Sequence, residues 1–155
     1  MKKFLVDCGT RDPLASSGIL LLRVAIGGMM LFGHGIPKWQ NYGTLVEKWT
    51  TVPALWPLSY MTAPMSLMAA IAAEVFAAAL LALGLLTRPA AFMLGFAMCV
   101  AAFQQHGGDP FFSTGGPSKE MAVLYLIPCF VLIITGAGQW SLDAMFTHDK
   151  RRRRR

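Results

Sequence analysis

Four apolar stretches constrain this chain most, and they lie at residues 17–36, 64–86, 90–106 and 118–136. A helix needs about 20 apolar residues to cross a bilayer, because the hydrocarbon core is about 30 Å thick and each residue advances about 1.5 Å. Several of the stretches reach that length, and each carries few charges. The sequence therefore predicts an all-α integral membrane protein, a four-helix bundle that crosses the bilayer four times as a single domain.

Composition favours the same fold class, since 55% of the 155 residues are hydrophobic and only 14% are charged. A soluble globule of this size needs more polar side chains to cover its surface. Local signals place the ends of the helices. The segment at residues 87–89 predicts a tight turn, because Pro89 cannot continue the helix before it but suits the first turn of the next. Ser118 predicts the N-cap of the fourth helix, and Gly136 predicts its end.

Lysine and arginine are distributed unevenly between the two sides of such a bundle, and positive residues near helix ends are retained in the cytoplasm. If both termini face inward, the inner side holds Lys2, Lys3, Arg11, Arg88 and residues 150–155, and the outer side holds Lys38, Lys48 and Lys119. We therefore predict cytoplasmic termini and a multi-pass protein of a bacterial inner membrane, with the first span as a retained anchor. The basic tail at residues 148–155 is more typical of contact with anionic lipid than with nucleic acid.

The outer loop at residues 37–63 is long, and long loops often carry function. Its aromatic residues are Trp39, Tyr42, Trp49, Trp56 and Tyr60. Indole and phenol rings favour the membrane interface, so the loop predicts an aromatic belt with a short in-plane helix around residues 44–50. The alternative is that the rings form a lid over a site.

Two charged residues lie inside the predicted spans, Arg23 in the first and Glu74 in the second. A charge at mid-membrane is tolerated only where it faces protein or water. The depths of the two residues differ by about the reach of an arginine, so we expect a direct or water-bridged Arg23–Glu74 pair. Such a pair would hold two helices together. The alternative is a proton-handling role for Glu74, and both residues are candidate catalytic groups.

A second polar cluster is expected near the outer surface, where three predicted helices end or begin. It consists of His34, Gln104, Gln105, His106, Lys119 and Glu120. Gln105 and His106 can donate hydrogen bonds to a carbonyl-bearing head group, while His34 and Glu120 can exchange protons with it. The alternative is that polar residues gather at helix ends in any membrane protein.

The sequence shows no motif for a metal or a covalently held redox group. Cys8, Cys99 and Cys129 form no C-x-x-C pair, and the three histidines are isolated from one another. We therefore predict no metal site.

Several short motifs follow one another along the chain. They are Leu22-Arg23 before Gly33-His34-Gly35 and Lys38, Glu74 before Gly84-Leu85-Leu86-Thr87-Arg88, Lys119-Glu120 before Tyr125, and Gly136-x-Gly138 before Ser141-Leu142-Asp143. In this combination the chain resembles DoxX membrane proteins over nearly all of residues 17–143. The resemblance implies a four-helix membrane bundle and an association with quinone-linked oxidoreductases, among them an archaeal thiosulfate:quinone oxidoreductase. A distant animal relative of DoxX proteins assists receptor assembly, so the resemblance also allows a role in assembly.

These observations predict a small membrane subunit that offers a quinone or quinol site, or a docking surface, to a redox partner in a larger membrane complex. In this interpretation the outer cluster binds the quinone head group. The alternative is a non-catalytic assembly or accessory subunit. Small-solute transport is less favoured, because the spans show no internal repeat and no pair of broken helices.

Overall fold

The computed structural model of the chain describes residues 9–10 and 12–146, and within them every regular element is a helix. The prediction of an all-α protein is confirmed. The predicted basic tail and the N-terminal lysines lie outside the described residues.

Each apolar window of the sequence is occupied by a long helical stretch. The first stretch joins α2 (Pro13–Met30), the π-helical segment η1 (Leu31–Gly35) and α3 (Ile36–Gln40). The second joins α5 (Ala63–Ala72), the π-helical segment η3 (Ala73–Ala77) and α6 (Ala78–Leu83). The third joins α7 (Thr87–Val100) and the π-helical segment η4 (Ala101–Gln105), and the fourth is α8 (Glu120–Thr135). The loop after α3 contains the short elements α4 (Tyr42–Val46) and η2 (Leu58–Tyr60).

The first stretch begins four residues before the predicted window, and its cap explains why. Asp12 precedes Pro13, and its Oδ1 atom accepts a hydrogen bond from the Ala15 amide at 2.7 Å. A side-chain cap followed by proline at the first helical position is a favoured helix start. Residues 13–16 therefore belong to the first helix, although they precede its predicted apolar window.

Two predicted helix boundaries are wrong. Ser118 is not an N-cap, because α8 begins at Glu120 and Lys119 holds the cap position. Residues 87–89 are not a turn, because they form the first turn of α7. The chain reverses just before them, where Gly84 has a φ of 70° and Leu86 a φ of 49°. Glycine adopts such angles without strain, so the preceding glycine was the better turn signal.

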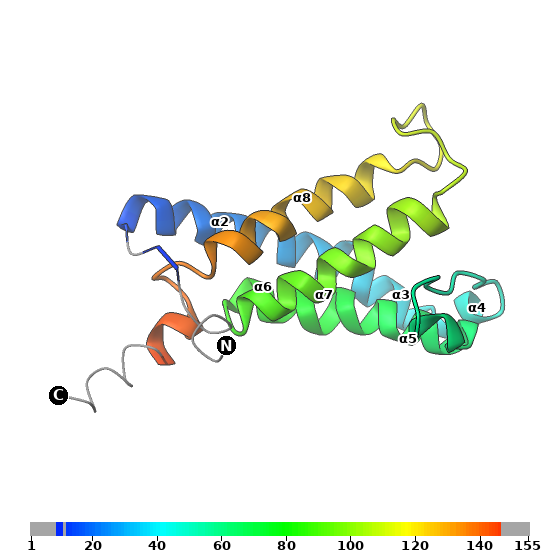
Figure 1. Cartoon of the computed structure of the whole chain (residues 1–155), viewed down its shortest axis with the longest axis horizontal. Coiled ribbons are helices and arrows are strands. Elements are labelled where there is room, and N and C mark those ends of the chain that lie inside the picture. The colour runs from blue at the N-terminus through cyan, green and yellow to red at the C-terminus, as the bar shows by residue number, and fades with distance from the viewer. Residues whose placement is uncertain (1–8, 11, 147–155) are drawn as a thin grey trace.

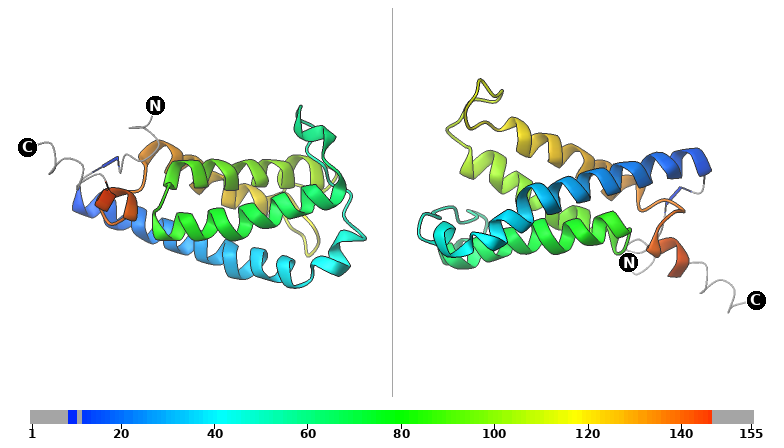
Figure 2. Two further views of the ribbon diagram at one scale, coloured as in Figure 1. Left: turned by 90° about the horizontal axis from the view of Figure 1, so that it is seen from below. Right: turned by 180° about the vertical axis from the view of Figure 1, so that it is seen from behind.

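The long helices lie side by side along the long axis of the molecule, as Figures 1 and 2 show. Within the described chain α2 packs on α6, α6 on α7, and α7 on α8. One end, which we call the terminal end, holds residues 9–10 and 12, the turn at 84–86 and residues 136–146. The opposite end, which we call the loop end, holds residues 41–62 and 106–119. Successive helices therefore run in opposite directions between these two ends.

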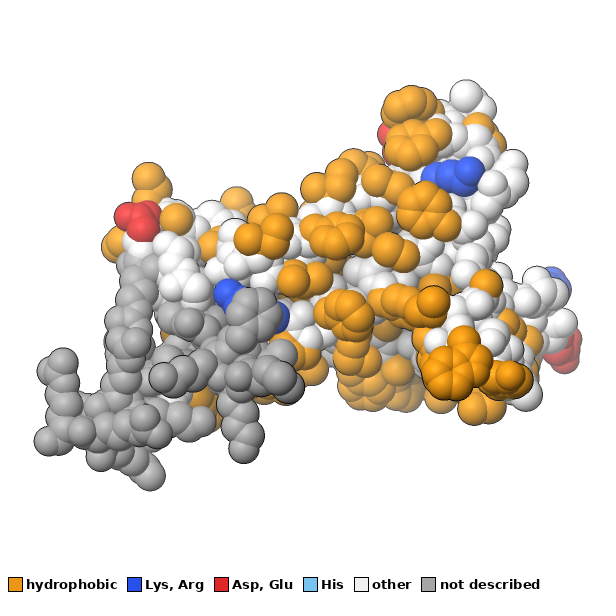
Figure 3. All heavy atoms as spheres, in the orientation of Figure 1, with side chains coloured by type: hydrophobic (Ala, Val, Ile, Leu, Met, Phe, Trp, Pro, Cys, Tyr) orange, Lys and Arg blue, Asp and Glu red, His pale blue; other side chains and the backbone are white. Residues whose placement is uncertain are grey.

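The surface of the protein is apolar along the helices. On the face drawn in Figure 3, hydrophobic side chains cover most of the length, and the coloured charges lie toward the two ends. Several charged and polar side chains are buried instead: Ser16, Arg23, Ser66, Glu74, Thr87, Arg88, Ser118, Ser141 and Asp143. This distribution is typical of a protein that faces lipid. Two described helices, Pro13–Gln40 and Ala63–Leu83, are long and apolar enough to cross a membrane, and Glu120–Thr135 is a shorter apolar helix.

The first and second helical stretches approach each other closely at two glycines. A Cβ atom added to Gly27 would lie 2.6 Å from the Ala78 carbonyl oxygen, and one added to Gly35 would lie 2.6 Å from the Glu74 carbonyl oxygen. Small residues allow membrane helices to pack backbone against backbone. The contact at Gly35 fixes η1 against η3 at the loop end.

Candidate functional site

Arg23 is fully buried, and it is bound to backbone carbonyls near the terminal end. Its Nη1 atom donates to the Leu81 oxygen at 3.3 Å, and its Nη2 atom donates to the Trp140 oxygen at 2.7 Å. The predicted Arg23–Glu74 pair is therefore wrong. Helical side chains tilt toward the N-terminus of their helix, and these two helices are antiparallel. The two side chains consequently point toward opposite ends of the molecule.

Asp143 completes this terminal-end cluster. Its two carboxylate oxygens accept hydrogen bonds from the amides of Leu86 and Thr87, at 2.9 and 3.0 Å, and its own amide donates to the Gly84 oxygen at 2.9 Å. A carboxylate at the start of α7 satisfies amides that have no partner within the helix. Asp143 also lies near enough to Arg23 for their charges to attract. The motifs around Gly84 and Asp143 thus fasten the C-terminal segment to the bundle.

At the loop end, Glu74 forms an ion pair with Lys38. Lys38 follows His34 by one helical turn and tilts back along its helix, while Glu74 tilts toward the loop end, so the two side chains meet. Only 3% of Glu74 is exposed, and its Oε2 atom has no hydrogen-bond partner among the described residues. From the sequence Lys38 was only an outer charge and part of a family motif, although its spacing from His34 already placed the two on one face.

A cavity of about 200 Å³ lies beside this pair. Three residues of the predicted outer cluster line it: His34, Gln105 and His106. The His34 ring contacts the Tyr125 ring edge to face, with centroids 5.5 Å apart. The structure thus brings together residues from the first, third and fourth helical stretches around one chamber, which we call the polar cavity.

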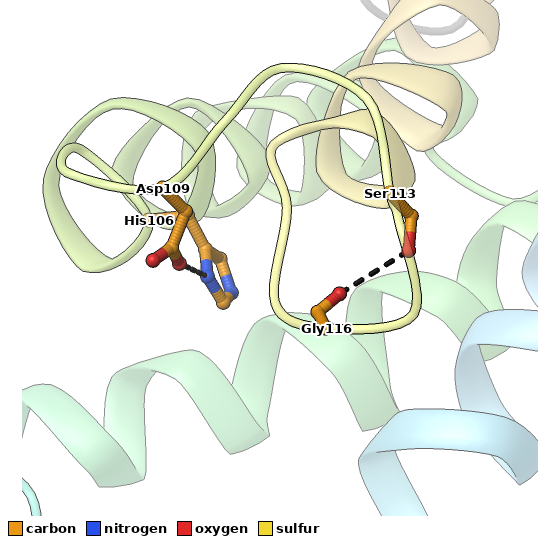
Figure 4. Close-up of polar contacts among 4 residues, drawn as sticks. All are labelled: His106, Asp109, Ser113 and Gly116. Carbon is orange, nitrogen blue, oxygen red and sulfur yellow. Dashed lines mark hydrogen bonds and ion pairs between the residues drawn. The ribbon is translucent and has the colours of Figure 1, made fainter.

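Lys119 and Glu120 do not line either of the cavities described here. The Oε2 atom of Glu120 accepts a hydrogen bond from the Ser113 amide at 2.9 Å, so it shapes the loop before α8. His106 is held from the same loop, because Asp109 Oδ2 lies 2.7 Å from its Nδ1 atom (Figure 4). The Ser113 hydroxyl also donates to the Gly116 oxygen at 3.2 Å (Figure 4). The roles predicted for these residues in ligand binding stay predictions.

A second cavity of about 250 Å³ lies on the other side of the Lys38–Glu74 pair, and we call it the apolar cavity. Most of its lining is hydrophobic: Pro53, Leu58, Met61, Ala69, Ala70, Ala73, Phe92, Met93, Phe96, Ala97, Val100 and Ala101. Two of these side chains, Phe92 and Met93, are 63% and 53% exposed on the surface of the molecule. The apolar cavity therefore reaches the surface that faces lipid.

The two cavities share part of their lining, namely Lys38, Glu74, Ala101 and Gln105. An ion pair and an amide side chain thus stand at a junction with polar groups on one side and apolar groups on the other. Ligand sites are commonly apolar chambers with a few convergent polar groups. The junction is the point at which an amphipathic molecule would place its polar part.

Each of the three π-helical segments contributes a side chain to this junction or beside it. His34 lies in η1, Glu74 in η3 and Gln105 in η4. A π-helical turn inserts extra backbone into a helix and often occurs at functional sites. Such turns occur in the first, second and third helical stretches, and none is found among the described residues of the terminal end.

The outer loop covers the apolar cavity with a segment at residues 49–54, which we call the strap. The Thr51 oxygen accepts hydrogen bonds from the Ser66 hydroxyl at 2.6 Å and from Trp49 Nε1 at 2.9 Å. The Ala54 amide donates to Gln104 Oε1 at 3.2 Å. Trp49 also lines the cavity, as the lid alternative expected.

Other rings of the outer loop face outward. Trp56 and Tyr60 are 74% and 79% exposed, as an aromatic belt requires. The short helix predicted around residues 44–50 lies slightly earlier, at Tyr42–Val46. The aromatic residues of this loop therefore divide between covering a cavity and facing the surroundings.

With its apolar surface, buried charges and membrane-length helices, the structure is that of a helical membrane protein. The DoxX family model matches residues 18–107, more than half of the chain, and the chain belongs to the DoxX family. The family resemblance is confirmed. No solved structure matches the chain.

Two relatives come from Haemophilus influenzae, and each is described only as an uncharacterized protein. The first is 26% identical over 139 residues, which cover 90% of this chain and 89% of the relative. The second is 40% identical over 88 residues, which cover 54% of this chain and 63% of the relative. The first relative extends the similarity over almost the whole chain.

Proposed function

We propose that this protein is a small membrane subunit of a quinone-linked oxidoreductase system, and that its loop-end cavities hold the head group of a quinone or quinol. The DoxX family is membrane-associated and often linked to oxidoreductase function, which supports the general class. The geometry of the loop end supports a quinone as the ligand.

The observation that carries the proposal is the junction of the two cavities at Lys38, Glu74 and Gln105. A membrane quinone combines a ring bearing two carbonyl oxygens with a long apolar tail. The polar cavity offers hydrogen-bonding groups for the ring, and the apolar cavity offers a path for the tail to the lipid-facing surface.

His34 and His106 stand where protons are exchanged with a bound head group. Reduction of a quinone takes up two electrons and two protons, and histidine is the side chain best suited to release or accept a proton near neutral pH. Asp109 fixes the orientation of the His106 ring, since it holds the Nδ1 atom. The electrons come from a redox partner within the larger membrane complex.

The proposal is tested by extracting and quantifying quinone from the purified protein. We expect bound quinone near one molecule per chain in the wild type, and lower occupancy in His34→Ala and in His106→Ala while the protein stays folded. Gln40→Ala is the matched control, because Gln40 is an exposed amide at the end of the same helical stretch as His34. Full occupancy in both histidine variants would contradict the assignment of these residues.

The second candidate is a non-catalytic assembly or accessory subunit. The terminal-end cluster favours it in part, because Arg23 and Asp143 serve to hold the protein together. Wild-type protein that copurifies with a stable protein complex in mild detergent, but with no quinone, would make this second function the better one.

The proposed arrangement in the membrane is a four-helix bundle of a bacterial inner membrane, with both termini in the cytoplasm. Two observations support it: both described ends of the chain lie at the terminal end, and the positive residues of the sequence favour that side. A reporter fused after Arg155 should then report cytoplasm, and reporters inserted at the exposed Gly43 or Gly115 should report the outer side. A periplasm-active reporter at Arg155 would overturn the count of four crossings.

A further inference from the structure

The Lys38 ammonium group is turned into the protein. A lysine near the end of a membrane span ordinarily extends its charge toward water. Here the side chain is only 27% exposed, it is paired with Glu74, and its Nζ atom lies 6.0 Å from the centroid of the Trp49 ring. The positive charge is therefore held at the junction of the two cavities, beneath the strap.

The ammonium group has more donors than the protein uses. Lysine carries three N–H groups. One of them donates to Glu74 Oε1, and among the described residues no second acceptor for the Lys38 Nζ atom is found. Lys38 lines both cavities, so its remaining N–H groups are available to a molecule at the junction.

We propose that Lys38 donates a hydrogen bond to a carbonyl oxygen of the quinone head group, and that Glu74 is a positioning residue that holds the ammonium at the junction. This inference rests on the proposed quinone site. The proposed donor, Lys38, lies outside the predicted cluster. In the proposed orientation of the quinone, the ring lies in the polar cavity near His34 and Gln105, and the tail follows the apolar cavity.

Replacing the Lys38–Glu74 pair should affect stability alone if the pair is purely structural, and ligand affinity as well if it binds a ligand. Replacing one partner of a buried pair leaves the other charge unpaired and destabilises the fold, whereas replacing both with apolar residues of similar length can restore stability. Methionine is a suitable replacement at both positions, because it is unbranched and adapts to irregular space. The double replacement therefore separates stability from binding.

The experiment measures dissociation constants for two short-tailed probes, decylubiquinone and menaquinone-1, together with the thermal unfolding midpoint of each variant. We expect Lys38→Met to lower the midpoint and to weaken binding by about tenfold, because a charge-assisted hydrogen bond is lost. In the double variant Lys38→Met/Glu74→Met the midpoint should recover while the tenfold weakening remains. Lys48→Met is the matched control, since it removes an exposed lysine from the same end of the molecule.

The outcomes distinguish the two proposals. A double variant that binds the probe as the wild type does would overturn the role of Lys38 and leave the quinone site standing, provided that His34→Ala still weakens binding. A wild-type protein that binds neither probe would overturn the quinone site itself, and the Lys38 assignment with it.

Discussion

The two ends of this molecule bury charge in different ways. At the terminal end, Arg23 and Asp143 bind backbone carbonyls and amides, and the described cavities lie elsewhere. At the loop end, Lys38 and Glu74 bind each other, beside two cavities and within helices that contain π-helical turns. A charged side chain that is bound to backbone groups stabilises the fold. A lysine paired with a carboxylate beside a cavity keeps N–H groups that can donate to a ligand. The role of a buried charged residue in a membrane helix is therefore indicated by its bonding partners rather than by its depth.

The largest effect is expected at Asp143. Asp143→Ala removes the acceptor of two α7 amides and leaves the Arg23 charge without its neighbouring anion, so the free energy of unfolding should fall by about 3 kcal/mol. The measurement is detergent-induced unfolding of the purified protein. Asp12→Ala is the matched control, because Asp12 is an exposed carboxylate that caps α2, and its loss should lower stability by about 1 kcal/mol. Equal losses in the two variants would show that the terminal-end cluster is no more than an ordinary helix cap.

A smaller loss is expected from Gly84→Ala. The new Cβ atom would collide with the Arg23 guanidinium group, and Gly84 has a φ of 70°, so we expect stability to fall by about 2 kcal/mol. Gly28→Ala is the control, since Gly28 lies in α2 with nothing within 4 Å of its added Cβ atom. Alanine is the better helix former, so this control should be neutral or stabilising by up to about 1 kcal/mol. A neutral Gly84→Ala would mean that the turn and Arg23 can move apart freely.

Double-mutant cycles compare the two ends directly. Lys38→Met and Glu74→Met should couple by about 1–2 kcal/mol, because the two side chains are in contact. Arg23→Met and Glu74→Met should instead be additive within about 0.5 kcal/mol, because the two share no partner. Both cycles are measured by the same unfolding titration. Coupling between Arg23 and Glu74 would contradict the division of the molecule into two separate charged regions.

Much of the fold could be predicted from the sequence, because it depends on long apolar runs. The windows located the helices, since a helix in lipid must be long and apolar. The boundaries at residues 87–89 and at Ser118 were wrong, because a proline or a serine is compatible with several positions near a helix end. The capping partner of α7 is Asp143, more than fifty residues away, and no local pattern can indicate it.

The site was predictable in part. His34, Gln105 and His106 were grouped by depth alone, and the structure places them around one cavity. Arg23 and Glu74 were paired by depth as well, and that failed, because antiparallel helices direct their side chains toward opposite ends. The same tilt of helical side chains directs Lys38 toward Glu74. Helix direction, combined with depth, would have found the observed pair.

The smallest effect is expected at the strap. Two hydrogen bonds fasten it to the helices beneath, one from Ser66 to Thr51 and one from Ala54 to Gln104. A single hydrogen bond adds about 1 kcal/mol to stability, so Ser66→Ala and Gln104→Ala should each change the global free energy of unfolding by about 1 kcal/mol or less. Local opening should change more than that, because the strap has few other attachments. In Ser66→Ala the Ala54 amide, which donates to Gln104, should exchange hydrogen several-fold faster, while the amides of α8 keep their wild-type rates. Faster exchange in α8 as well would show that Ser66 stabilises the whole fold rather than the cover of the apolar cavity.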